Sequence, residues 1–338
     1  MAYHGRRVFL TGHTGFKGSW LAWWLHRLGA EVAGYALPPS TQPSLWQALG
    51  LERDIQDIQS DIRDLPRLKQ AMQAFRPDLV FHLAAQALVL PSYEDPIGTF
   101  STNLMGTVNV LEACRRCDSL QAVVVVTTDK CYLNAGAGRA FQEDDPLGGA
   151  DPYSASKACA ELAVAAYRHS FWAKDRGLAT VRAGNVIGGG DWSPQRLMPD
   201  LVRAVQSGRT LTLRRPEARR PWQHVLDPLR GYLTLGAELG ARPEEFSGAW
   251  NFGPAESEAR QVRELVELAG GAWQLDPDPA PPEANQLQLD STKASSLLGW
   301  CPRWSLEIAA TRTMAWYQGF AEGLAATELC TADLEAHL

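Results

Sequence analysis

The sequence contains a tyrosine and a lysine four residues apart, in "DPYSASKACAEL". Tyr153 and Lys157 have the i, i+4 spacing that places two side chains on one face of a helix. A phenol has a pKa near 10, and an ammonium group beside it favours the phenolate. Tyr153 could then accept the proton of an alcohol that is being oxidised. The spacing is common, so its meaning depends on the residues around it.

An acid and a base follow four consecutive valines in "VVVVTTDKCYLN", where Thr128, Asp129 and Lys130 stand together. A valine run indicates a strand covered on both faces, and ligands of open α/β sheets bind at the carboxyl ends of strands. Elimination of water needs an acid and a base beyond the tyrosine, whereas oxidation alone does not. Asp129, if protonated in a dry pocket, is the candidate acid and Lys130 the candidate base. Two alternatives stay open: Lys130 only orients other groups, or the pair is a solvated turn.

A glycine-rich loop, "VFLTGHTGFKGSW", places Gly12, Gly15 and Gly18 between a predicted strand and a predicted helix. Backbone amides and a helix N-terminus at such a loop suit a pyrophosphate, so we expect a dinucleotide there. A glycine-rich turn without a ligand is the alternative. An acidic residue usually follows about 20 positions later to hold the ribose of NAD, but "YALPPSTQ" has neither an acid nor an arginine. This region therefore does not decide between NAD and NADP.

The elements that must position these groups alternate between strand-like and helical patterns, which is typical of a doubly wound, Rossmann-like parallel sheet of the α/β class. The predicted strands are 6–12, 31–37, 55–62, 78–85, 122–128 and 178–188. The predicted helices between them are 16–29, 64–75, 98–117 and 153–173. Asp64 is the expected N-cap of the second of these helices, with Pro66 in its first turn.

From about residue 189 the chain is richer in Gly and Pro, which indicates a smaller, mixed α/β lobe over the carboxyl edge of the sheet. We expect an NAD-binding domain of residues 1–188 with a returning segment at 225–254, and a substrate lobe of residues 189–224 and 255–338. Expected helices here are 199–208, 225–239, 261–270, 291–298 and 305–322. The tail after Gly323 is expected to fray or to form a short helix.

The composition excludes several classes of protein. A net charge of -6 over 338 residues and a pI near 5.7 argue against binding to nucleic acid or an anionic membrane. We see no signal peptide and no apolar run that could span a bilayer, so we expect a cytoplasmic protein. Six scattered cysteines suit a reducing compartment. Cys114 and Cys117 lack a second pair or a suitably spaced histidine, so no metal site is expected.

Motifs along nearly the whole chain resemble the nucleotide-sugar dehydratases of the extended short-chain dehydrogenase/reductase family, and among them the group that acts on CDP-glucose. They are "TGHTGFKGSWL", "HLAAQ", "TTDKCY", "YSASK", "GNVIGGGDW", "RLMPD", "RPWQHVLDPLRGYL", "WNFGP" and "LGWCPRWSL". The Asp-Lys pair, "GNVIGGGDW" and "RPWQHV" are the most specific, because related dehydratases typically have Asp-Glu at positions 129 and 130.

The resemblance implies NAD as cofactor and a CDP-sugar as substrate, in the formation of deoxysugar precursors of surface polysaccharide such as O-antigen. It further implies a homodimer through helices 98–117 and 153–173, with a tetramer as the alternative. The implied catalytic residues are Thr128, Asp129, Lys130, Tyr153 and Lys157. The implied cofactor-binding residues are Gly12, His13, Gly15, Phe16, Gly18, Asp61, Ile62, Leu83, Ala84, Ala85, Asn103, Thr127, Tyr153 and Lys157. The implied substrate-binding residues are Gln86, Tyr93, Asn185, Arg196, Arg220 and His224, and Glu143 is a further candidate for the glucose pocket.

Some of these roles have a plain structural alternative. Asp61 holds the adenine or is a turn residue, and His82 lies near the nicotinamide ribose or is packed in the core. The arginines of "RRPEARRPWQH" neutralise a diphosphate or belong to a solvated loop. The sequence also departs from the family at Leu90 and Pro91, where basic residues are expected, and at Pro282, where a histidine is expected.

Two other functions remain to be tested. A nucleotide-sugar 4-epimerase shares the fold and the tyrosine but has no need of Asp129 and Lys130. A non-catalytic NAD-sensing protein commonly lacks Tyr153 or Lys157, and both are present.

Overall fold

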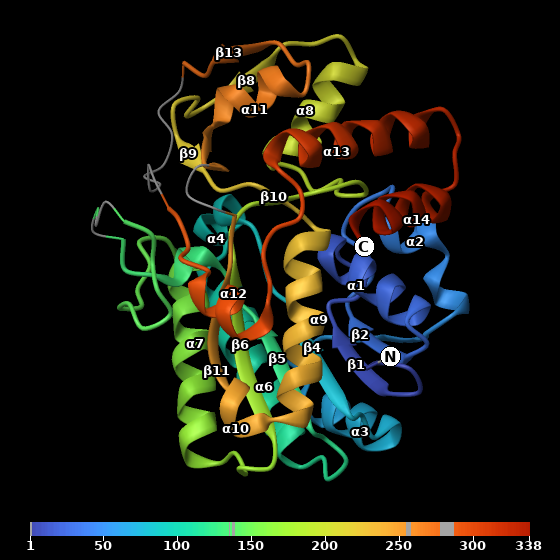
Figure 1. Ribbon diagram of the computed structural model, residues 1–338, viewed down its shortest axis with the longest axis vertical. Helices are drawn as coiled ribbons and strands as arrows, with labels where there is room; N and C mark the ends of the chain where they lie inside the picture. Colours follow the sequence, from blue (N-terminus) through green and yellow to red (C-terminus); the bar gives the residue numbers. More distant parts are fainter. Residues whose placement is uncertain (1, 135, 137–138, 255–257, 278–286) are drawn as a thin grey trace.

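A computed structural model describes the chain except residues 1, 135, 137–138, 255–257 and 278–286 (Figure 1). Position 282, where a histidine was expected, lies outside the described residues. The main sheet has seven parallel strands in the order β11-β6-β5-β4-β1-β2-β3. The strands are Arg7–Thr11 (β1), Glu31–Ala36 (β2), Gln56–Gln59 (β3), Leu79–His82 (β4), Ala122–Val126 (β5), Gly177–Ala183 (β6) and Gly248–Phe252 (β11). The doubly wound α/β fold expected from the sequence is confirmed.

Helices cover both faces of this sheet. The helices of the sheet-forming part are Phe16–Arg27 (α1), Leu45–Leu49 (α2), Leu65–Phe75 (α3), Val89–Glu94 (α4), Pro96–Phe100 (α5), Gly106–Arg115 (α6), Pro152–Ser170 (α7), Leu226–Ala241 (α9), Pro243–Phe246 (α10) and Thr292–Leu298 (α12). A π-helical turn, Ser101–Met105 (η2), joins α5 to α6, and short 3-10 turns lie at Leu51–Arg53 (η1) and Asp129–Cys131 (η3). As expected, the Asp64 side chain caps α3.

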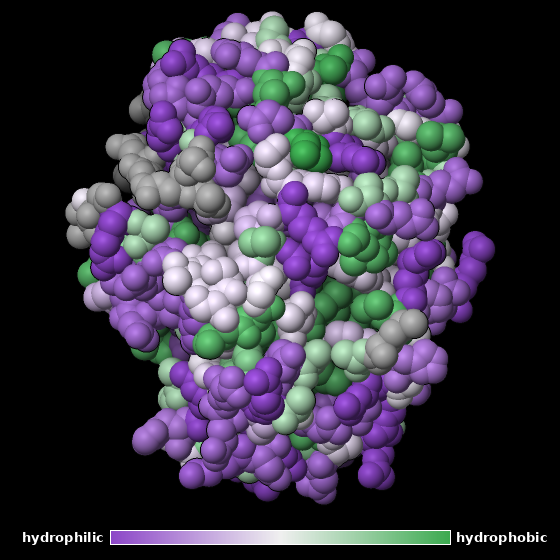
Figure 2. All heavy atoms as spheres, in the orientation of Figure 1, coloured by the Kyte–Doolittle hydropathy of each residue, from purple (hydrophilic) through white to green (hydrophobic). Residues whose placement is uncertain are grey.

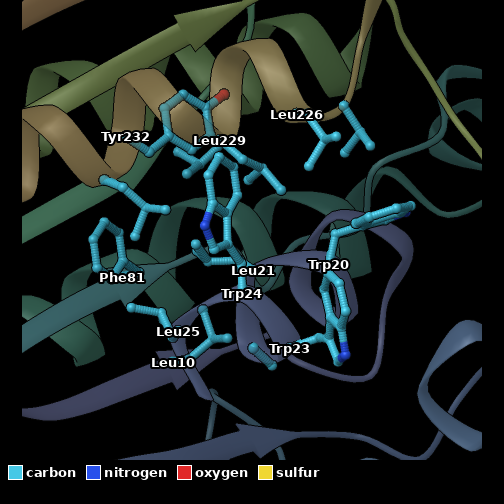
Figure 3. Close-up of a cluster of buried hydrophobic side chains, with 14 of the residues drawn as sticks. Leu10, Trp20, Leu21, Trp23, Trp24, Leu25, Phe81, Leu226, Leu229 and Tyr232 are labelled. Atoms are coloured by element: carbon cyan, nitrogen blue, oxygen red, sulfur yellow. The ribbon is translucent and has the colours of Figure 1, made fainter. Parts of the chain in front are cut away.

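Alternating side chains of the strands feed two separate cores, which is what burial on both faces requires. Val8 and Leu10 of β1 face one core, and Phe9 between them faces the other. In the first core α1 packs against α9, and Figure 3 shows Trp24 and Leu21 of α1 beside Leu229 and Tyr232 of α9. Helices α3, α6 and α7 cover the second core. This arrangement holds the tips of β1, β4 and β5 at one edge.

A smaller lobe lies beyond the carboxyl edge of the sheet (Figure 1). It contains short strand pairs made by Val186–Ile187 (β7), Leu211–Leu213 (β8), Arg219–Arg220 (β9), Gln223–His224 (β10), Arg260–Gln261 (β12) and Trp273–Leu275 (β13). Its helices are Leu197–Gln206 (α8), Val262–Leu268 (α11), Leu306–Ala321 (α13) and Ala326–His337 (α14). Grey atoms aside, hydrophilic side chains cover most of the face seen in Figure 2, and apolar ones reach it in small separate areas.

The predicted elements can be compared with the structure at β11, at the end of β6 and in the tail. β11 was not predicted as a strand, although its residues lie in the segment 225–254 that we expected to return to the sheet. The predicted strand 178–188 was wrong in one respect, because the chain breaks after Ala183 and β7 pairs with β10 in the lobe. Of the two outcomes expected for the tail, the structure has the helix, α14, one face of which is buried.

Candidate active site

The polar trio lies in a tight turn at the tip of β5. The Thr128 hydroxyl accepts a hydrogen bond from the Lys130 amide at 3.3 Å and donates one to Asp129 Oδ1 at 3.0 Å. Thr128 thereby caps the single 3-10 turn η3, and Asp129 is buried. The turn is a built feature of the sheet edge, which argues against an ordinary solvated loop.

Helix α7 brings Tyr153 and Lys157 to the same place. Asp151 caps the helix, because its carboxylate accepts from the Ser154 amide at 2.9 Å and from the Ser154 hydroxyl at 2.6 Å. Pro152 occupies the first turn, where its missing N–H costs nothing. Both Tyr153 and Lys157 are buried, and Lys157 Nζ donates to the Val126 carbonyl at the end of β5, at 3.0 Å. The lysine thus connects the catalytic helix to the strand that carries the turn.

Burial dominates the protonation of this site. It raises the pKa of the Asp129 carboxyl, while Lys130, Thr128 and Arg220 act in the opposite direction. Burial raises the pKa of Tyr153 to about 12, partly offset by the hydrogen bond with Thr128 and the charge of Arg196. Burial also lowers the pKa of Lys157 to about 8. Asp129 therefore has the character of an acid. The pKa of Tyr153 therefore shifts away from the phenolate, whereas the sequence led us to expect that the neighbouring ammonium would favour it.

The glycine-rich loop has the shape of a cradle. Gly12 has a φ of +78°, and a Cβ there would lie 2.6 Å from the Ala84 backbone. A Cβ on Gly18 would lie 2.0 Å from the Gly12 carbonyl, so the loop and α1 can approach only without it. A Cβ on Gly15 would meet only the Gly12 carbonyl, at 3.5 Å, and Gly15 offers the first-turn amides of α1 no side-chain acceptor. The space and the donors fit a dinucleotide pyrophosphate.

Other predicted cofactor residues point their side chains into the protein. The buried His13 ring contacts the carboxylate of Asp57 at 2.8 Å and packs edge-on against Trp46. Phe16 is partly buried against the first core. The Thr127 hydroxyl donates to Glu161 Oε1 at 2.5 Å. Only the backbone of His13 and Thr127 could therefore face a cofactor.

The tips of β3 and β4 show what the two ambiguous residues do. The Asp61 carboxylate accepts two charge-assisted bonds from Arg63 Nε and Nη2, at 2.9 and 2.6 Å, and its pKa is lowered by them. The His82 ring lies between the hydroxyls of Thr11 and Thr107, at 2.7 and 3.0 Å, so it is a packed core histidine. The remaining predicted cofactor residues of these tips are Ile62, which is buried, and Leu83, Ala84 and Ala85, which are partly exposed.

A polar network behind the β4 tip fixes the loop that carries Gln86. Asn103, within η2, accepts from the Gln86 amide at 2.8 Å and donates to the Gln86 carbonyl and to Ser156, both at 2.9 Å. The Gln86 side chain bonds to Leu88 and Thr99. A π-helical turn is often found at functional sites. Here it orients Asn103 toward both the loop and α7.

The predicted substrate residues come from several elements, and only some of them act on the acid–base groups. Arg196 occupies the N-cap position of α8 without a side-chain capping bond and pairs with Asp191 at 3.3 Å, and its charge acts on Tyr153. Buried Arg220 lies on β9, and its charge acts on Asp129. Asn185 is half-buried between β6 and β7, and Tyr93 is exposed on α4. The Glu143 carboxylate instead accepts from the Asn251 amide at 2.9 Å.

His224 does not join this group. Its ring is fully buried, 4.7 Å from the ring of Trp304 and 4.0 Å from the Asp333 carboxylate of α14. The side chain has no surface open to a ligand, so we do not carry His224 into the proposed substrate contacts.

Sequence reasoning missed Lys17, within the glycine-rich loop. Burial and the charge of Arg196 lower its pKa to about 8, while Asp129 and Asp191 act in the opposite direction. Lys17 therefore lies among the groups of the acid–base turn. A lysine between Phe16 and Gly18, at the start of a helix that faces a ligand, was the signal available in the sequence.

The comparisons with known proteins agree with this geometry. The sequence model of the GDP-mannose 4,6 dehydratase family matches residues 9–313. The chain belongs to this family. Among its relatives, a CDP-glucose 4,6-dehydratase from Salmonella typhimurium is 46% identical over 333 residues, which cover 95% of this chain and 93% of that protein. A probable dTDP-glucose 4,6-dehydratase from Sinorhizobium fredii is 27% identical, with 92% of each chain covered.

Solved structures of related enzymes share the fold. UDP-glucose 4-epimerase from Thermus thermophilus in complex with NAD superposes with a TM-score of 0.81 and 28% identity, covering 93% of this chain and 99% of that one. The dTDP-glucose 4,6-dehydratase from Bacillus anthracis in complex with NAD has a TM-score of 0.79 at 21% identity, with 96% and 100% covered. A solved epimerase and a solved dehydratase therefore both share this fold.

Two features are absent from the described residues. In the parts of the chain that the structure covers, no three His, Cys, Asp or Glu side chains gather as a metal site would require. No described helix is long and apolar enough to cross a membrane.

Proposed function

We propose that this protein is an NAD-dependent nucleotide-sugar 4,6-dehydratase that converts CDP-glucose to CDP-4-keto-6-deoxyglucose and water. The buried acid–base turn Thr128–Asp129–Lys130, held beside Tyr153 and Lys157, is the observation that carries the proposal. An epimerase needs no second acid and base, whereas elimination of water does. The 46% identity with the Salmonella enzyme supports CDP-glucose as the substrate.

The cofactor fits the cradle of Gly12, Gly15 and Gly18 described above. Bound NAD would accept the hydride of the sugar C4 and later return it to C6, so no net oxidant is consumed. Its positive nicotinamide ring would also favour the phenolate of Tyr153, against the effect of burial. The proposed cofactor contacts include the backbone near Asp61, Ile62, Leu83, Ala84 and Ala85 and the amide of His13.

The chain's own residues move the protons. Tyr153 takes the proton of the C4 hydroxyl, which Thr128 orients, and leaves a ketone at C4. The ketone acidifies C5, whose proton Lys130 removes. Asp129 protonates the C6 hydroxyl, which departs as water, and Lys130 returns a proton to C5 when hydride reaches C6. Arg196 and Arg220 neutralise the diphosphate of the substrate.

The experiment is an assay with CDP-glucose and NAD that follows the alkaline absorbance of the 4-keto product. Tyr153→Phe should form no reduced cofactor, because nothing accepts the C4 hydroxyl proton. Asp129→Asn should form bound reduced cofactor and stall before water loss, with product formation lowered at least about 100-fold. Equal loss of the first step in both variants would remove Asp129 from the acid role. Conversion of another nucleotide sugar but not CDP-glucose would overturn the substrate.

The same proposal includes a homodimer formed by α5, α6 and α7, with a tetramer as the alternative. Ile97 on α5 is 83% exposed, Leu162 on α7 is 59% exposed and Met105 in η2 is 51% exposed, and these elements contact one another. Exposed large apolar residues on adjacent helices favour a partner surface. Ile97→Glu with Leu162→Glu should yield monomers in sedimentation, while exposed Leu275→Glu, in the lobe, should not. A wild-type monomer would contradict the dimer.

A cytoplasmic location is also part of the proposal. All six cysteines are free thiols, which suits a reducing compartment.

A further inference from the structure

A buried ion pair is bonded to residues on both sides of the acid–base turn. Glu161 on α7 and Arg182 on β6 are each 3% exposed, and Arg182 Nη2 lies 2.8 Å from Glu161 Oε2. Arg182 Nε also donates to Glu161 Oε1 at 3.0 Å, so the pair is bidentate. Burying two charges costs several kcal/mol per ion, and well-packed apolar residues often replace such a pair without loss of stability. The stability of the fold therefore does not by itself explain why this ion pair is present.

The carboxylate of this pair holds the N-terminal end of the acid–base turn. Glu161 Oε1 accepts from the Thr127 hydroxyl at 2.5 Å, and Oε2 accepts from the Thr180 hydroxyl at 2.7 Å. Thr127 immediately precedes Thr128, so this bond connects the tip of β5 to α7. Glu161 follows Lys157 by one helical turn and Tyr153 by two, which places all three on one face of α7.

The guanidinium of Arg182 holds the C-terminal end of the turn. Arg182 Nη1 donates to the Tyr132 hydroxyl at 2.7 Å and to the Glu143 carbonyl at 2.9 Å, and the guanidinium carbon lies 4.8 Å from the centre of the Tyr132 ring. Tyr132 in turn donates to Asn251 Oδ1 of β11 at 2.8 Å. Thr127, directly before the turn, and Tyr132, two residues after Lys130, are thus bonded to the two halves of one ion pair.

We propose that Glu161 and Arg182 are positioning residues that clamp both ends of the acid–base turn against α7, and that Glu161, one helical turn after Lys157 on the same face of α7, supports the Lys157 ammonium charge through space. This inference rests on the proposed dehydratase function. The clamp fixes Asp129 and Lys130 relative to Tyr153, so that oxidation at C4 and elimination at C5 and C6 occur on one bound sugar.

The effect of Glu161 on the charge of Lys157 can be measured separately from any effect on stability. Burial lowers the pKa of Lys157 and Glu161 opposes that effect most strongly. The other titratable groups that act on Lys157 or on which it acts are Cys131 in the turn, His82 on β4 and Lys17 on α1. Lys157 must be protonated to favour the phenolate. Removal of the Glu161 charge should therefore make the first hydride transfer fail at a lower pH.

The test follows reduced cofactor in a single turnover with CDP-glucose and NAD, over a range of pH, in the full-length protein. The alkaline limb of this rate should move down by about one pH unit or more in Glu161→Gln. Glu238→Gln is the matched control, because Glu238 on α9 also pairs with an arginine, Arg242, but on the surface and through one carboxylate oxygen. The control should keep the wild-type profile. An unchanged alkaline limb in Glu161→Gln would overturn the proposal.

A second variant separates positioning from stability. Glu161→Leu with Arg182→Met replaces the ion pair by apolar groups, which should restore most of any stability lost in Glu161→Gln. The alkaline limb should remain shifted in this double variant, since the carboxylate is still missing. Recovery of the wild-type pH profile together with the stability would show a purely structural role and overturn the proposal. A wild type that makes no 4-keto sugar would instead refute the proposed function.

Discussion

At the scale of single residues, His82 shows how a motif residue becomes a core residue. Its two ring nitrogens lie against two threonine hydroxyls, and burial followed by the charge of Lys157 lowers its pKa to about 3. Because the folded pKa lies below the unfolded value of 6.5, its contribution to stability is present above pH 6.5. That contribution is lost as the pH falls from 6.5 toward 3.

His82→Asn should therefore flatten the acid dependence of stability. An amide can still bond to Thr11 and Thr107 but does not titrate, so the free energy lost between pH 7 and pH 5 should shrink by about 2 kcal/mol. Urea unfolding at the two pH values measures this difference. Exposed His4→Asn is the control and should leave the slope as in the wild type. A wild-type slope in His82→Asn would mean that His82 is not held neutral in the fold.

Residue types and spacing predicted several of the polar groups that meet at the site, but not Lys17. The Tyr153–Lys157 spacing and the end of the valine strand located Asp129 and Lys130, and the structure brings these residues together. Spacing could not say which way a polar side chain turns. Thr127 and His13 follow strand or loop positions that suit a cofactor, yet their side chains bond to Glu161 and Asp57, which come from elements far away in sequence.

At the scale of elements, Gly15 and Gly18 at the start of α1 should respond differently to substitution. A Cβ on Gly18 would overlap the Gly12 carbonyl, whereas a Cβ on Gly15 has room and a φ of -81° that any residue adopts. Gly18→Ala should thus destabilise the protein by about 1–3 kcal/mol, since loop and helix must separate. Gly15→Ala should leave thermal stability nearly unchanged but lower the affinity for NAD at least about tenfold, because the methyl group takes the space of a phosphate.

Thermal unfolding without NAD and titration with NAD give the two readouts for each variant. Gly50→Ala is the control for a glycine with open space around it, although its φ of +64° will cost some stability. Equal loss of NAD affinity and of stability in both loop variants would contradict separate roles for Gly15 and Gly18.

Elements with a regular pattern were predictable, and those defined by distant partners were not. The predicted helices 64–75 and 153–173 correspond to α3 and α7, because each begins with an aspartate cap and a proline. β11 is a strand only because it pairs with β6, about 70 residues earlier along the chain. The segment "GAWNF" has no alternation or turn signal strong enough to predict that pairing.

At the scale of the whole molecule, the last helix packs against an early part of the chain, α2, and against the lobe. In Figure 1, α14 lies over α2 and near α1, and α14 also contacts α13 of the lobe. His337 Nε2 lies 2.9 Å from Asp227 Oδ1, with both side chains fully buried, and the Arg303 amide donates to the same oxygen at 2.7 Å. A tail that local pattern left between fraying and folding is thus fixed by α9 and by the segment before α13.

His337→Ala should loosen α14, because it leaves the Asp227 carboxylate buried with one bond fewer. Leaving a buried polar group with one partner fewer costs about 1–3 kcal/mol, so we expect a loss of about 2 kcal/mol in chemical unfolding and faster proteolysis within α14. Glu335→Ala, on the exposed face of the same helix, should behave as the wild type. α14 packs against α2 and not against the acid–base turn. Below its unfolding temperature, His337→Ala should therefore keep most of the wild-type activity. Unfolding midpoints that match in the two variants would show that His337 does not hold the helix.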